Sequence, residues 1–124
     1  MKVVLLTVPF LLAIALVVYT ERSFSGFTFW NALPIVLGLG VLLAARRSHL
    51  ATIVGCATFA IAATLLVVLF HLAWFFDWGG TATSSSTSAL AFIFVPFWAC
   101  IFASIVASLA WVVMRLVRKG HVAQ

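Results

Sequence analysis

Apolar residues fall into four long runs along the chain, separated by three polar connections. The runs are residues 3–20, 27–45, 50–76 and 89–114. A helix needs about 20 apolar residues to cross the hydrocarbon of a bilayer, and about 17 to 25 are seen in practice. The pattern therefore predicts an all-α polytopic membrane protein in which four transmembrane helices form a single bundle over residues 1–124.

The first run, residues 3–20, has two interpretations. A charged residue before an apolar core is typical of a signal peptide, and Lys2 precedes this run. However, the core is longer than the usual stretch of about 7 to 15 residues, and no small-x-small cleavage site precedes Tyr19. We therefore expect the run to remain in the protein as an uncleaved first helix.

The composition supports a membrane protein and argues against a soluble domain and against a nucleic-acid-binding protein. Of the 124 residues, 66% are hydrophobic and only 7% are charged, whereas about a quarter of the residues in a soluble domain are charged. The formal net charge of +5 would suggest nucleic acid in a soluble chain, but here the cations flank the apolar runs, where they orient a membrane protein. We therefore expect the lipid bilayer as the chain's surroundings and no nucleic-acid partner.

The distribution of Lys and Arg predicts the orientation of the bundle. In a four-helix arrangement, six of the seven fall on one side of the membrane and only Arg22 falls on the other. Lys and Arg are retained in the cytoplasm during insertion, so both termini should be cytoplasmic and the loop at residues 77–88 should face outward. The expected location is the bacterial inner (plasma) membrane. The six residues on the cytoplasmic side are Lys2, Arg46, Arg47, Arg115, Arg118 and Lys119.

Small residues recur every four positions in the third and fourth runs, which predicts faces for helix packing. Lipid tails are as apolar as Leu, so membrane helices associate where small side chains allow their backbones to approach. We expect the two stripes to pack against each other or against a neighbour. The first stripe is Thr52, Cys56, Ala60 and Thr64, and the second is Ala99, Ala103 and Ala107.

Ionisable residues inside a membrane helix are costly and are functional candidates by default. This chain has almost none, because Glu21 follows the end of the first run, Asp77 follows the third, and only His71 falls inside a run. From His71 to Asp77 is about 9 Å of helix. We therefore interpret His71 as a partly hydrated interfacial imidazole in preference to a proton relay.

The scarcity of reactive side chains argues against catalysis, metal binding and proton-coupled export. His49 and His121 should lie on the inner side and His71 on the outer, so they cannot converge on a metal. The sequence has neither a nucleophile elbow nor a phosphate loop. Small four-span multidrug exporters have a similar length but carry an acidic residue in the first span, which residues 3–20 lack. We expect no enzymatic activity, no catalytic residue, no metal and no cofactor.

The longest polar segment, residues 77–88, also has two interpretations. As a spacer, it is a solvated turn in which Gly79 and Gly80 permit positive φ. As a recognition surface, it offers a partner one charge, one aromatic anchor and several hydroxyls. Both interpretations stay open at this point. The partner-binding residues in the second are Trp74, Asp77, Trp78, Ser84, Ser85 and Ser86.

In size, four-span hydropathy and short loops, the whole chain resembles the small inner-membrane immunity proteins encoded beside pore-forming or membrane-targeted toxins. The resemblance implies a non-enzymatic protein that binds a toxin's inserted helices before they assemble a pore. The main alternative is a small oligomeric channel or transporter component, in which Thr64, Ser104, Ser108 and the Ser/Thr row at residues 81–88 line a polar path. A homo-oligomer is compatible with both. A holin-like lysis protein is a third class.

Overall fold

The computed structural model describes residues 2–22 and 26–122, with side chains described for residues 7–22 and 26–120. Four long helices, α1 to α4, account for most of the described chain. Two short 3-10 turns, η1 and η2, lie in the connection between α3 and α4. The helices are α1 (Lys2–Glu21), α2 (Gly26–Ala45), α3 (Leu50–Phe75) and α4 (Ala91–Val122), and the turns are η1 (Trp78–Gly80) and η2 (Ser88–Leu90). The predicted all-α fold with four helices is confirmed.

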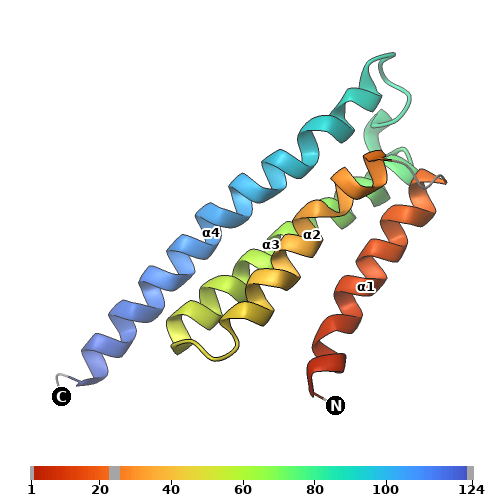
Figure 1. Ribbon diagram of the computed structural model, residues 1–124. Coiled ribbons are helices and arrows are strands. Elements are labelled where there is room, and N and C mark those ends of the chain that lie inside the picture. Colours follow the sequence, from red (N-terminus) through yellow and green to blue (C-terminus); the bar gives the residue numbers. More distant parts are fainter. Residues whose placement is uncertain (1, 23–25, 123–124) are drawn as a thin grey trace.

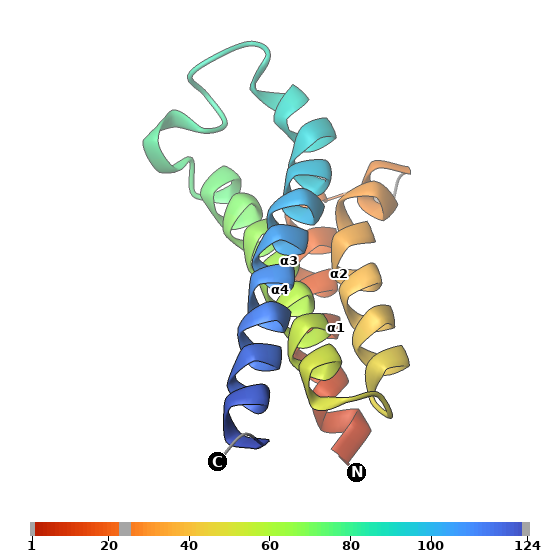
Figure 2. The ribbon, with the colours of Figure 1, turned by 90° about the vertical axis from the view of Figure 1, so that its left-hand side faces the viewer.

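Successive helices run in opposite directions (Figure 1). Both termini lie at one end of the molecule, together with the turn at residues 46–49 that joins α2 to α3. The connection at residues 76–90 lies at the opposite end and projects beyond the helices in both views (Figure 2). We call these the basic end and the loop end, because Arg46, Arg47 and the cations near the C-terminus all lie in segments at the first.

α2 and α3 form the centre of the bundle. Among the described residues each of them contacts all three other helices, whereas no Cα atoms of α1 and α4 lie within 8 Å of each other. A Cβ built on Gly38 of α2 would lie 2.8 Å from the Cα of Ala60, so α2 and α3 meet at backbone distance. A Cβ on Gly55 of α3 would lie 3.4 Å from the carbonyl oxygen of Ala107 in α4. These are the close approaches on which membrane helices rely for association.

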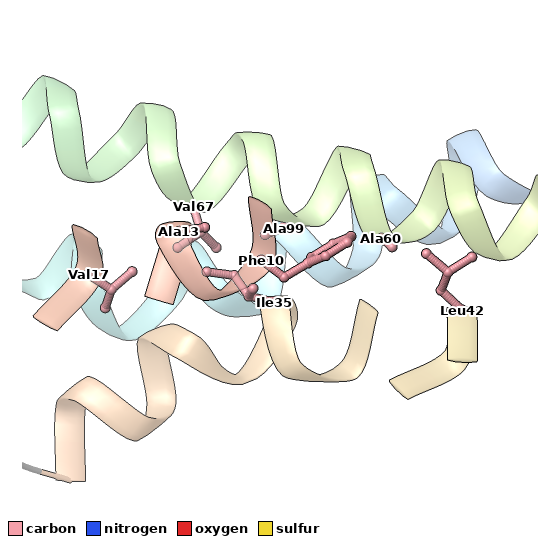
Figure 3. Close-up of a cluster of buried hydrophobic side chains, with 8 residues drawn as sticks. All are labelled: Phe10, Ala13, Val17, Ile35, Leu42, Ala60, Val67 and Ala99. Carbon is pink, nitrogen blue, oxygen red and sulfur yellow. The ribbon is translucent and has the colours of Figure 1, made fainter. Parts of the chain in front are cut away.

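A cluster of buried apolar side chains joins all four helices (Figure 3). Val17, Ile35 and Val67 in this cluster are fully buried. Outside the cluster, large apolar side chains on every helix are exposed, as expected where the surroundings are lipid. The cluster consists of Phe10, Ala13, Val17, Ile35, Leu42, Ala60, Val67 and Ala99.

Among residues 7–22 and 26–120, three helical segments are long and apolar enough to cross a membrane: α2, α3 and the segment Ser88–Gly120 that contains most of α4. α1 has 20 residues, as many as α2. The helix bounds agree with the predicted runs to within two residues, except that α4 continues eight residues past Met114. Lys and Arg are good helix formers, so the basic residues there ended the predicted apolar run without ending the helix.

Replacing Gly38 with Ala should destabilise the bundle. The added methyl group would meet the Cα of Ala60 at 2.8 Å, and overpacking of this kind costs about 1–3 kcal/mol. Gly40→Ala is the matched control, because a Cβ at Gly40 meets nothing within 4 Å and Ala favours helix over Gly. Detergent-induced unfolding in mixed micelles, followed by circular dichroism, should show a lower stability for Gly38→Ala and no loss of stability for Gly40→Ala. Equal stability of the two variants would contradict the packing of α2 on α3.

Candidate functional site

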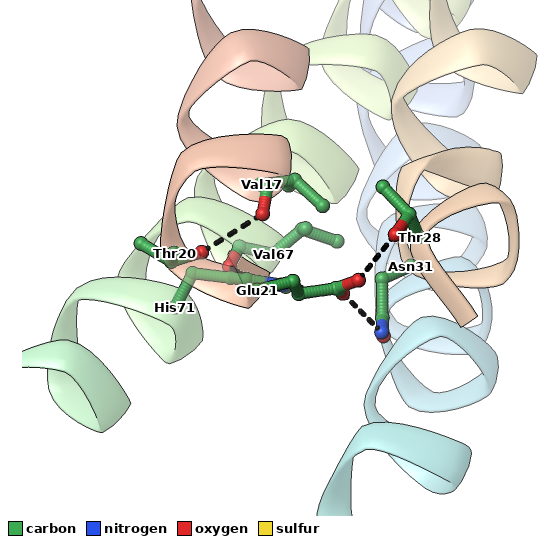
Figure 4. A network of polar contacts seen from close by, with 7 residues as sticks. All are labelled: Val17, Thr20, Glu21, Thr28, Asn31, Val67 and His71. Atoms are coloured by element: carbon green, nitrogen blue, oxygen red, sulfur yellow. Dashed lines mark hydrogen bonds and ion pairs between the residues drawn. The ribbon is translucent and has the colours of Figure 1, made fainter. Parts of the chain in front are cut away.

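Polar side chains from three helices meet at the loop end of the bundle (Figure 4). Glu21 is the last residue of α1, Thr28 and Asn31 lie in the first turns of α2, and His71 lies one turn before the end of α3. Residues three apart share a helix face, so Thr28 and Asn31 are directed to the same neighbour. Glu21 lies opposite that face and bonds to both residues. We call these four residues the polar cluster.

The carboxylate of Glu21 is the centre of the polar cluster. Its Oε2 accepts a hydrogen bond of 2.7 Å from the hydroxyl of Thr28, and its Oε1 accepts one of 2.7 Å from Nδ2 of Asn31. Oε1 also lies 3.5 Å from Nε2 of His71. The side chain of Glu21 is 10% exposed, and its three neighbours are buried. The cluster therefore holds a carboxylate and an imidazole within the helices, where such groups are costly unless they are paired.

The ring of His71 links α3 to the end of α1. Its Nδ1 lies 2.8 Å from the backbone carbonyl of Val67, and since a carbonyl only accepts, Nδ1 is the donor of this hydrogen bond. The other ring nitrogen, Nε2, lies 3.5 Å from Oε1 of Glu21.

The structure corrects two expectations about ionisable residues. The interpretation of His71 as a partly hydrated imidazole is wrong, because its side chain is 0% exposed. Its ring contacts the ring of Phe92 edge-on, with the two ring centroids 5.4 Å apart. The expectation that Glu21 lies past the first helix is also wrong, because α1 includes it and its side chain lies inside the bundle. Thr28 and Asn31 supply the donors that replace water, and a Thr-x-x-Asn spacing within an apolar run is the sequence signal for such an acceptor.

A second polar arrangement fixes the loop between α3 and α4. Asp77 adopts the left-handed conformation, with φ of 49°, which Asp tolerates better than most residues. Its carboxylate accepts hydrogen bonds from the backbone N–H groups of Ala82 at 2.8 Å and Thr83 at 3.2 Å, and from the hydroxyl of Thr83 at 2.6 Å. The hydroxyl of Thr83, followed by the N–H of Ala82, lowers the pKa of Asp77 below its ordinary value. Gly79 and Gly80 have φ of 62° and 77°, as predicted for this turn.

The same loop keeps two aromatic rings exposed. Phe76 and Trp78 stack with their centroids 6.0 Å apart and an interplanar angle of 15°. They are 59% and 53% exposed. Since Asp77 lies between them in the chain and bonds across the loop, the rings are presented on a fixed backbone.

The other residues predicted for partner binding lie in two different places. Trp74 packs against Phe92 of α4, with ring centroids 4.7 Å apart, and so belongs to the wall between α3 and α4. Ser84, Ser85 and Ser86 are exposed on the loop, where the hydroxyl of Ser85 lies 2.9 Å from that of Thr87. The structure therefore brings Asp77 and Trp78 together on the loop and places Trp74 in the helical body.

The two stripes of small residues do not lie along one contact, because Ala60 of the first stripe meets Gly38 of α2, whereas the second stripe is on α4. Ala60, Ala99 and Ala103 are buried. Further toward the basic end α3 and α4 leave an open groove of about 480 Å³. Thr64 lines a different pocket, between α1, α2 and α3. Residues lining the groove include Thr52, Cys56, Ser104, Ala107 and Ser108.

No group of three or more His, Cys, Asp or Glu side chains that could hold a metal ion occurs among residues 7–22 and 26–120. Comparisons with models of protein families, with curated proteins and with solved structures found no match. Function must therefore be inferred from the polar cluster and the loop themselves.

Replacing Glu21 with Ala should destabilise the protein more than replacing it with Gln. Alanine removes the acceptor for Thr28 and Asn31, and a buried donor without a partner costs about 1–3 kcal/mol. Glutamine keeps one acceptor oxygen, for either Thr28 or Asn31, so part of the stability should remain. Unfolding by detergent distinguishes the two variants. A Glu21→Ala protein as stable as the unchanged chain would rule out the cluster as a structural element.

The hydrogen bonds of Asp77 should be lost as pH falls. Its pKa is lowered in the folded loop, so its contribution is fully present above the ordinary carboxyl value of about 3.9 and disappears as pH drops through the lowered folded value. In micelles, the amide proton resonances of Ala82 and Thr83 should move toward the chemical shifts of a disordered chain as pH falls below the ordinary carboxyl value. Asp77→Ala is the control and should give those chemical shifts at every pH. Resonances that stay fixed down to pH values where carboxylates are protonated would contradict the bonding of Asp77.

Proposed function

We propose that the chain is a non-enzymatic integral membrane protein that binds a partner in or at the membrane, most concretely an immunity protein that neutralises a pore-forming toxin. The observation that carries the proposal is the stacked pair Phe76 and Trp78, exposed on a loop that Asp77 fixes. Aromatic anchors dominate binding energy at protein interfaces. A surface that is fixed before binding loses little conformational entropy when a partner docks.

The proposed location is the bacterial inner membrane, with the loop end facing outward and both termini in the cytoplasm. Support comes from the position of the cations, because the turn with Arg46 and Arg47 lies at the same end as the C-terminal segment with Arg115, Arg118 and Lys119. Segments rich in Lys and Arg are retained in the cytoplasm. In this orientation a toxin arriving from outside would meet the loop before it reached the hydrocarbon.

The proposed mechanism is occupation of the toxin's inserted helix. The lining of the groove between α3 and α4 includes small side chains, among them Cys56, Ser104 and Ala107, beside larger aromatic and aliphatic ones. Small residues let a second helix approach closely in lipid. Phe76 and Trp78 would hold the toxin at the membrane surface while its helix lies in this groove. A toxin helix held in this way cannot join others in a pore.

The double variant Asp77→Ala with Trp78→Ala should abolish protection and leave membrane abundance unchanged. The test is survival of a sensitive host challenged with the toxin encoded beside the gene, with abundance measured in isolated membranes. Trp98→Ala is the matched control, since Trp98 is also largely exposed, at 62%, but lies on α4 away from the loop. Full protection by the double variant would remove the loop from the mechanism. A fall in abundance would show instead that the rings serve as membrane anchors.

A small oligomeric channel or transporter component is the second candidate, and the polar cluster favours it. Ionisable pairs within membrane helices are typical of ion and proton pathways, and Glu21 and His71 lie 3.5 Å apart there. Reconstituted liposomes separate the candidates. Ion or proton flux through the purified protein alone would support the second, whereas a silent protein that suppresses a toxin's leak would support the first.

A further inference from the structure

A pocket of about 380 Å³ opens beside the polar cluster at the loop end. Glu21 of α1 and Asn31 of α2 form its polar wall, and Trp74 of α3 and Phe92 of α4 form its aromatic wall. We propose that this pocket binds a primary ammonium group, R–NH₃⁺. The proposal goes beyond both candidate functions, because it concerns a ligand site in the helical body and does not require the loop or a pore.

The side chain of Asn31 has an oxygen that lacks a donor. Asn31 is 1% exposed, and its Nδ2 donates to Oε1 of Glu21 at 2.7 Å. This bond fixes the orientation of the amide, because the reversed amide would place its oxygen against a carboxylate oxygen. Oδ1 is then buried with no hydrogen-bond partner. Figure 4 shows the amide directed at the end of Glu21. Since an unpaired buried acceptor is unfavourable, a ligand N–H that reaches Oδ1 would be stabilised.

The polar groups around the pocket include three acceptors. The first two are the carboxylate of Glu21 and Oδ1 of Asn31. The third is the oxygen of Thr20, whose hydroxyl proton is donated to the carbonyl of Val17 at 3.0 Å. An ammonium group carries three N–H donors and no acceptor, so it matches this set. Its positive charge would also strengthen the hydrogen bond to the carboxylate.

The aromatic wall accounts for the rest of the ligand. The rings of Trp74 and Phe92 are 4.7 Å apart and nearly perpendicular, at 72°. Aromatic faces attract cations, and Trp attracts them most strongly. An alkyl chain on the ammonium nitrogen would lie against these rings and against Phe27, which also lines the pocket. This combination favours an alkylammonium over a bare Na⁺ ion, because the hydrated ion gains little from an apolar wall.

A free alkylamine and the lysine side chain of a partner share this chemistry. The test titrates the purified full chain in micelles with n-butylammonium chloride, using calorimetry and tryptophan fluorescence. Two further probes isolate the features of the ligand: n-butanol lacks the charge, and tetramethylammonium lacks the N–H donors. We expect saturable binding of n-butylammonium, binding of tetramethylammonium weaker by about tenfold or more, and no binding of n-butanol. A Leu-rich helical peptide with a single Lys forms a separate arm, and tighter binding of that peptide than of n-butylammonium would identify a partner as the source.

Asn31→Leu should weaken n-butylammonium binding by about tenfold or more, because it removes Oδ1 at similar side-chain volume. Thr64→Val is the matched control: it also removes a buried unpaired oxygen, but from the separate pocket between α1, α2 and α3, and binding should be unchanged. If Asn31→Leu lowers helicity, Trp74→Leu replaces it, since that change removes a wall of the pocket and leaves the polar cluster intact. The proposal would be overturned if n-butylammonium showed no saturable binding, or if Na⁺ bound and n-butylammonium did not. It would also be overturned if the folded pocket variant, Asn31→Leu or Trp74→Leu, bound n-butylammonium as tightly as Thr64→Val does.

Discussion

The approach of neighbouring backbones to α3 is the constraint on which the rest of the structure depends. In lipid, apolar side chains gain little by leaving their surroundings, so helices associate where small residues permit close contact. Gly38 against Ala60 and Gly55 against Ala107 provide such contacts on two sides of α3. Because α1 and α2 both pack on α3, the end of α1 meets the side chain of His71. A wider bundle would leave Glu21 without His71 as a neighbour.

Directional bonds at the loop end complement this packing. Apolar contacts tolerate sliding and rotation, whereas hydrogen bonds require particular atoms to meet. Glu21 links α1 to α2 through Thr28 and Asn31, and the indole N–H of Trp30 donates to the carbonyl of Ile93 at 2.9 Å, which links α2 to α4. The bundle therefore combines an apolar middle with a loop end in which the helices are held in register. The pocket beside the polar cluster lies at that hydrogen-bonded end.

The sequence predicted the helices well because a membrane helix depends mainly on the length and composition of its own run. It could not predict the pairing of Glu21 with His71, since that contact joins residues 50 apart and depends on how α1 lies on α3. A single run shows a carboxylate at its end and gives no sign that donors in the next helix will enclose it. The role of Asp77 was likewise only partly predictable. Gly79 and Gly80 indicated a turn, but the bonds of Asp77 to Ala82 and Thr83 depend on the folded path of the loop.

The unusual length of α4 has a consequence for how the molecule sits in lipid. Its 32 residues span about 48 Å, well beyond the roughly 30 Å of hydrocarbon. Near its end the guanidinium of Arg115 lies 4.0 Å from the centre of the Trp111 ring, a combination suited to the headgroup layer. This pair would fix the position of α4 along the bilayer normal. A shift of the helix in one direction would move the charge of Arg115 into the hydrocarbon, and a shift in the other would move the ring of Trp111 into water. The height at which Phe76 and Trp78 stand above the far leaflet would then be set from the opposite side of the bilayer.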